Sequence, residues 1–141
     1  MKGKVLALLL TGCGLLLAEL PALAHHAFAA VFDSKKPVKL MGTVTKIEWQ
    51  NPHTWFYIDV KDEGGNVANW GMEMGSPNLL IRAGWNRNSL KAGHVVTITG
   101  FRSKLSPTNA NARTVKLPDG RQVFAGSSFD IGPASEGQLE R

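Results

Sequence analysis

The histidines carry the most distinctive chemistry in the sequence. His25 and His26 follow the small-residue segment Ala22-Leu23-Ala24, and His53 follows Pro52 in the middle of the chain. If the chain is cut after Ala24, His25 gains a free amine beside its imidazole, and together these two groups chelate Cu(II). A second imidazole would complete a histidine brace of three nitrogens, a donor set that suits copper. His53 is the better second donor, because His26 follows His25 directly and cannot easily bend back to the same ion.

A simpler interpretation of the same histidines stays open. Two histidines near a chain end are often only exposed to solvent, and His53 can donate to a carbonyl and hold a turn. No cysteine and no evident carboxylate ligand accompanies either position. The sequence therefore leaves two hypotheses, a metal site at His25 and His53 or ordinary polar residues.

Two polar segments form a second candidate site. Residues 49–55 offer aromatic and amide side chains, and residues 102–113 offer amide, hydroxyl and basic donors. Together they suit a small polar or anionic ligand, such as a glycan fragment. The alternative is that the tryptophans pack against the N-terminal segment and that the second stretch is a solvated loop. The candidate ligand-binding residues are Trp49, Asn51, His53, Trp55, Arg102, Lys104 and Arg113.

Other classes of function find less support. Glu48, Asp59 and Glu73 show no paired spacing that indicates general acid–base catalysis, and no G-x-S-x-G motif accompanies a serine. Single-stranded nucleic acid requires a basic groove with stacking aromatic rings. The formal net charge is only +5, and it falls to +4 without residues 1–24. We therefore expect a binding protein, with no catalytic residues and no nucleic-acid partner.

The first 24 residues have the anatomy of a secretion signal. Lys2 and Lys4 precede an apolar stretch over 5–17, which is too short for a membrane span, and Ala22-Leu23-Ala24 fits a cleavage site. We expect cleavage after Ala24, a periplasmic or secreted product and no membrane span in the mature form. Cys13 allows an alternative, a lipoprotein cut before this residue, although the apolar stretch continues beyond it.

Alternating apolar residues predict strands over 38–49, 54–61, 67–74 and 95–101, and a last hairpin over 114–125. Ser76 and Pro77 predict a short helix that Gly84 ends. Residues 102–112 read as a long polar loop. Three strands, a helix and further strands follow the order of an OB barrel. The sequence thus predicts an all-β fold, a small OB-like β-barrel of five to six strands with one short α-helix between strands three and four. A generic small barrel or a sandwich is the alternative.

The predicted organisation is a signal peptide over 1–24, an N-terminal arm over 25–37, an OB-like domain over 38–125 and a disordered tail over 126–141. The tail is small and polar, which is typical of disorder. The mature domain has no cysteine, so its stability must come from the core of the barrel.

Four segments resemble a family of small exported bacterial proteins of unknown function. They are HHAFAAVFD (25–33), IEWQNPHTWFYIDV (47–60), GSPNLLIRAGW (75–85) and SLKAGHVVTITG (89–100). The HH, NPH and GW elements carry the resemblance, which implies an envelope location. Members carry an acidic residue where this chain has His94, and this departure weakens any special role for His94.

These observations lead to two hypotheses. The first is an exported, non-enzymatic envelope protein that holds a metal ion, copper in particular, or a small polar ligand at the mouth of the barrel. The alternative is an interaction module that docks onto an envelope protein through the Trp49–Trp55 edge and the N-terminal arm.

Overall fold

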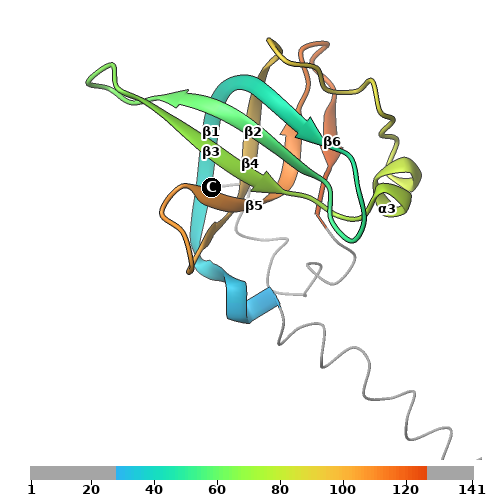
Figure 1. The fold of residues 1–141 in the computed structure, drawn as a ribbon, viewed down its shortest axis with the longest axis horizontal. Coiled ribbons are helices and arrows are strands. Elements are labelled where there is room, and N and C mark those ends of the chain that lie inside the picture. The colour runs from blue at the N-terminus through green and yellow to red at the C-terminus, as the bar shows by residue number, and fades with distance from the viewer. Residues whose placement is uncertain (1–27, 127–141) are drawn as a thin grey trace, which may run out of the picture.

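A single curved sheet forms most of the molecule (Figure 1). The computed structural model describes residues 28–126. Its strand order is β3-β2-β1-β4-β5-β6, and a further pairing of β3 with β5 closes the sheet into a ring. In chain order the elements are β1 (Phe32–Glu48), β2 (Trp55–Lys61), β3 (Val67–Glu73), α3 (Pro77–Arg82), β4 (Val95–Ser103), β5 (Asn109–Lys116) and β6 (Gln122–Phe124).

The long strand β1 joins the two halves of the ring. Its first part pairs with β4 and its last part pairs with β2, both in antiparallel fashion. The register against β2 shifts between Val44 and Lys46, and such a bulge bends a strand and increases its twist. Gly42 lies shortly before this bulge, where a Cβ atom would come within 2.6 Å of the Asp59 carbonyl oxygen.

The parallel pairing of β3 with β5 closes the ring. Gly71, Met72 and Glu73 lie opposite Asn109, Ala110 and Asn111 in turn. All other strand pairs are antiparallel. The prediction of an all-β, OB-like domain is therefore confirmed as a mostly β structure with a ring-like, six-stranded sheet.

Alternate residues of the strands fill the inside of the ring. Phe56, Ile58, Met72 and Ile98 are completely buried there. The same alternation places Trp55, Tyr57 and Glu73 on the outer face, because successive side chains of a strand point to opposite sides. Leu80 of α3 and Trp85 extend the core at the end of the ring beside the helix.

The short helix α3 lies between β3 and β4, as predicted. The Ser76 hydroxyl accepts a hydrogen bond from Leu79 N at 3.5 Å, and Pro77 is the first helical residue. Gly84 follows with a positive φ of 93°, a conformation that glycine adopts readily. In Figure 1 the helix lies at one side of the ring, and the β2–β3 hairpin extends on the other side.

Two element boundaries differ from the prediction. β1 begins at Phe32, where we expected an arm to continue to Pro37, because Phe32 and Asp33 pair with Ser103 and Arg102 of β4. The predicted loop over 102–112 shrinks, because β4 runs to Ser103 and β5 begins at Asn109. Asn and Ala have low strand propensity, and the pairing with two neighbouring strands overrides it here.

The predicted signal peptide, both of the first two histidines and nearly all of the predicted tail lie outside the described residues. Within 28–126, no helix is long and apolar enough to cross a membrane.

Candidate functional site

The structure brings His53 and Trp55 together on the outer face of β2 and β3. Trp55 begins β2 and lies opposite Glu73 of β3. His53 lies in the preceding turn, where a cis peptide bond joins Asn51 to Pro52. Thr54 N donates to Gly75 O at 3.1 Å, and Thr54 O accepts from Met74 N at 2.8 Å. These two backbone hydrogen bonds connect the turn to the end of β3. The turn is thus fixed against β3 on both sides of Thr54.

The His53 imidazole contacts the Glu73 carboxylate through Nδ1 and Oε1. An ionised carboxylate only accepts hydrogen bonds, so the proton of this contact belongs to Nδ1. The His53 side chain is 46% exposed, whereas that of Glu73 is 14% exposed. Glu73 therefore holds one nitrogen of the ring, and the second nitrogen, Nε2, is not part of this contact.

Buried polar side chains continue this face across β5. Asn111 lies opposite Glu73 on one side and Phe101 on the other. It is only 3% exposed, and its Oδ1 atom has no hydrogen-bond partner in the structure. Native proteins pair most buried polar atoms, because an unpaired one costs about 1–3 kcal/mol. An unsatisfied acceptor beside Glu73 thus distinguishes this face from an ordinary solvated sheet.

Arg113 follows Asn111 on the same side of β5. It is 5% exposed, and its guanidinium carbon lies 5.8 Å from the ring centre of Phe101 and 5.9 Å from that of Phe124. Cations at such distances are attracted to the ring faces. Arg113 was predicted as a donor on an open loop, but the structure places it in a strand between two aromatic rings.

The first described residues pack against the same face. The Phe28 ring lies 5.3 Å from that of Phe32 and 6.3 Å from that of Phe101, in tilted and edge-on arrangements. Lys104 holds the backbone here as well, since its Nζ donates to Ala29 O at 2.5 Å. Its backbone N–H donates to Val31 O at 2.8 Å. The chain before Phe28 therefore starts from an anchored position on the ring.

Three predicted ligand-binding residues lie elsewhere or have other partners. Asn51 is exposed in the turn before β2. Arg102 lies over the Trp70 ring at 5.2 Å and donates to Pro107 O at 2.9 Å. Lys104 binds the backbone of the N-terminal segment. The basic donors of the second predicted segment thus do not converge with His53 and Trp55.

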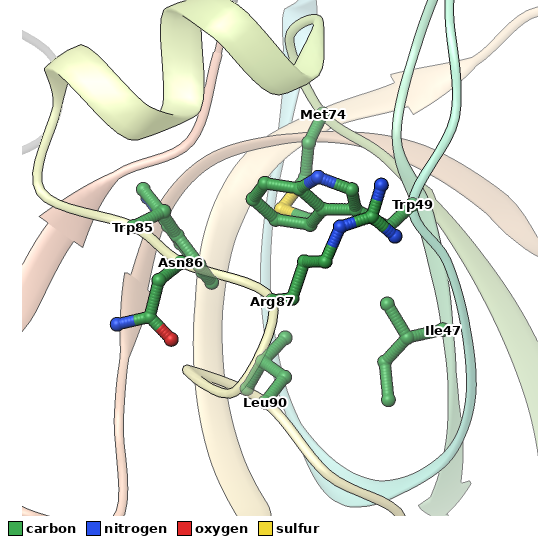
Figure 2. Close-up of a pocket in the computed structure, with 7 residues that line it drawn as sticks. All are labelled: Ile47, Trp49, Met74, Trp85, Asn86, Arg87 and Leu90. Atoms are coloured by element: carbon green, nitrogen blue, oxygen red, sulfur yellow. The ribbon is translucent and has the colours of Figure 1, made fainter.

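Trp49 lines a small hollow at the end of the ring beside α3 (Figure 2). The hollow measures about 10 Å³, room for about one water molecule. Its other lining residues are Ile47, Met74, Trp85, Asn86, Arg87 and Leu90. Trp49 packs against the core, whereas Trp55 lies on the outer face, so the two rings do not form one continuous edge.

Lys46, Glu48 and Tyr57 form a polar group next to Trp55. Glu48 contacts Lys46 through Oε1 and accepts a hydrogen bond from the Tyr57 hydroxyl at 3.1 Å. The hydrogen bond from Lys46 holds the pKa of Glu48 below its ordinary value. Burial, and then the hydrogen bond to Glu48, raise the pKa of Tyr57. At neutral pH this group consists of a carboxylate, an ammonium and a neutral phenol.

Sequence reasoning missed Glu73 and Asn111 as members of the site. Glu73 was considered only as an unpaired carboxylate, because its contact with His53 depends on a turn twenty residues away in the chain. Asn111 lay in a predicted loop. The alternation of Asn109, Asn111 and Arg113 was the available signal for a strand.

No three His, Cys, Asp or Glu side chains within 28–126 gather closely enough to hold a metal ion. The second metal ligand that we predicted, His25, lies outside the described residues.

Comparisons with known proteins give a family and no activity. A family model described as a family of unknown function, DUF6152, matches residues 14–111. No curated protein matches the chain significantly.

Proposed function

We propose, for a chain that belongs to the DUF6152 family of unknown function, that it is an exported, non-enzymatic binding protein of the bacterial envelope. Its ligand is a metal ion, with copper as the best fit, bound at His53. The observation that carries this proposal is the contact of His53 Nδ1 with Glu73.

This contact prepares one imidazole nitrogen for a metal. Histidines that bind metals usually donate their second ring N–H to a carboxylate or carbonyl, which fixes the tautomer and the orientation of the ring. In a neutral imidazole, a proton on Nδ1 leaves a lone pair on Nε2. A neutral imidazole nitrogen of this kind is a good ligand for copper. Glu73 acts here as the orienting residue of a metal-binding histidine.

Because the N-terminal segment is anchored on the ring, we propose His25 as the second residue that binds the metal. Three extended residues span at most about 10 Å, which is the reach from Phe28 back to His25. Phe28 rests on Phe101, and Phe101 is two strand spacings from Glu73, or about 10 Å. We propose that the amine and imidazole of a processed His25, with the added length of its side chain, complete the site at His53 Nε2.

Export is part of the same proposal. A free amine on His25 exists only after cleavage behind Ala24, and the basic, apolar and small-residue parts of 1–24 are typical of a secretion signal. The mature protein would then act in the periplasm or outside the cell.

A copper titration of protein that begins at His25 tests the proposal. We expect one Cu(II) ion per chain, and a strong loss of affinity in His53→Ala. His94→Ala is the matched control, because His94 Nδ1 also makes a hydrogen bond, accepted from Lys91 N, but His94 precedes β4 and does not contact Glu73. Equal losses in both variants would contradict the proposal.

A second form of the protein separates the role of the amine. One extra residue in front of His25 removes the chelate of amine and imidazole but keeps every side chain. We expect this form to bind copper much more weakly than the processed form. Unchanged affinity would exclude the histidine brace and leave His53 without its proposed partner.

A further inference from the structure

The outer face of β2 carries two aromatic rings in a row beside His53. Trp55 and Tyr57 alternate with the buried Phe56, so both rings lie on the same side of the sheet, and both are half-buried. Positions two apart in a strand are about 7 Å apart. The two rings thus form an elongated aromatic strip along one strand, on a face that is otherwise polar.

A glycine in β3 makes room beside this strip. A Cβ atom on Gly71 would lie 3.4 Å from Cζ3 of the Trp55 ring and 2.9 Å from Oδ1 of Asn109. The indole edge and the amide therefore both lie against the backbone of Gly71. The missing side chain places a hydrogen-bonding amide directly next to the edge of an aromatic ring.

Polar groups line the rest of the strip. Glu48 lies at the Tyr57 hydroxyl, at 3.1 Å, and Glu73 lies opposite Trp55. Farther along the strand, Asn69 donates to Asp59 at 2.8 Å and to Thr45 at 3.1 Å. Lys46 and Lys61 lie on the same face, because Lys61 alternates with Tyr57 and Asp59 along β2, so the three carboxylates accompany two lysines. The small excess of negative charge disfavours an anionic ligand, including nucleic acid.

From this arrangement we infer that the Trp55–Tyr57 strip binds an uncharged saccharide. One face of a sugar ring presents C–H groups that stack on an aromatic plane, and its edge presents hydroxyls that bond to amides and carboxylates. Trp55 supplies the plane, because the Lys46 ammonium lies over the Tyr57 ring, 5.5 Å from its centre. The Tyr57 hydroxyl, Asn109, Glu48 and Glu73 supply edge partners. This site lies beside the proposed metal position and does not depend on a bound ion.

The inference narrows the ligand class that the sequence suggested. The sequence favoured a polar or anionic ligand, such as a glycan fragment, with Arg102, Lys104 and Arg113 as donors opposite Trp55. In the structure Arg102 lies over the Trp70 ring, and Lys104 donates to the backbone of the N-terminal segment. Arg113 lies against the rings of Phe101 and Phe124. Three carboxylates and two lysines remain around the strip, and this small negative excess favours a neutral ligand over an anion.

Calorimetric titration of the full mature protein with cellotetraose tests the inference. Trp55→Ala should weaken binding roughly tenfold, the change that corresponds to the loss of one ring-stacking contact. Gly71→Ala should also weaken it, because the new methyl group must displace the Asn109 amide, a side-chain end that can move without unfolding the sheet. Gly64→Ala, in the distant hairpin turn, is the matched control and should bind like the unchanged protein.

Three results would overturn the inference. The first is no heat of binding with cellotetraose. The second is equal affinity in the unchanged protein and in a folded Gly71→Ala or Tyr57→Phe variant. These two variants keep the test valid if Trp55→Ala fails to fold. The third is equal or tighter binding of a hyaluronan tetrasaccharide, the acidic ligand of the same size. His53→Ala should retain saccharide binding, which distinguishes this site from the metal site.

Discussion

Removal of the Phe28 ring should loosen the N-terminal segment without destroying the sheet. Phe28 is half-buried, and its ring contacts only two described aromatic rings, those of Phe32 and Phe101. Truncation of a fully buried phenylalanine to alanine costs about 3–5 kcal/mol, so we expect about half of this, ~2 kcal/mol, for Phe28→Ala. The free energy of unfolding of small domains lies near 5–15 kcal/mol, and the variant should therefore still fold.

Urea denaturation measures the first consequence of Phe28→Ala. With a slope of about 1–3 kcal/mol per molar urea, the midpoint should fall by about 1 M. The second consequence concerns copper. Without its anchor, His25 spends less time near His53, and its effective concentration there falls. The copper affinity of the processed protein should therefore decrease together with its stability.

Phe124→Ala is the control that separates these two effects. Phe124 is also half-buried, and the described contact of its ring is with Arg113. We expect a comparable loss of stability with unchanged copper affinity. If Phe28→Ala loses stability but binds copper as tightly as the unchanged protein, the anchored segment does not position His25, and the reasoning fails.

Three further predictions concern the face around Glu73 and the polar group beside it. Glu73→Gln should lower copper affinity roughly 10–100-fold, the usual effect of changing the group that orients a metal-binding histidine, and a competition titration would show this. Gly100→Ala should destabilise the sheet by at least ~3 kcal/mol in urea denaturation, because the new Cβ would lie 1.7 Å from Asn111 O, a backbone atom that cannot move aside. Normal stability of this variant would contradict the register of β4 and β5. Because the pKa of Glu48 is held low by Lys46, its stabilising contact should persist above its ordinary pKa of 4.5 and be lost only as the pH falls through the lower, folded-state pKa. NMR titration of the Glu48 carboxyl should show this low pKa and its return towards 4.5 in Lys46→Ala, and an identical pKa in both proteins would refute the assignment.

Local patterns were sufficient for much of the fold. The alternation around Phe56 and Ile58 identified β2 and its buried face, and Ser76, Pro77 and Gly84 identified α3 and both of its ends. These signals depend on neighbouring residues alone. The order of strands and the helix then indicated the ring-like sheet.

The parts that were missed depend on contacts between distant segments. β5 begins at Asn109 because the backbones of β3 and β4 pair with it, although Asn and Ala favour strands only weakly. The start of β1 at Phe32 depends in the same way on β4. The alternation of Asn109, Asn111 and Arg113 indicates a strand, but the neighbouring residues alone do not reveal which strands it pairs with.

The same reason limited the prediction of the site. His53 and Trp55 are neighbours in the chain and were found together. Glu73 joins them only because β2 and β3 pair in one particular register. Arg102 and Lys104 have residue types that suit a ligand, but the structure uses both for internal contacts.

Electron paramagnetic resonance of the copper-loaded protein, processed to begin at His25, tests the central claim most directly. We predict a Cu(II) signal with hyperfine splitting from three nitrogens, one of which disappears in His53→Ala. An identical nitrogen pattern in the unchanged protein and in His53→Ala would show that copper binds away from the face that Glu73 and His53 define.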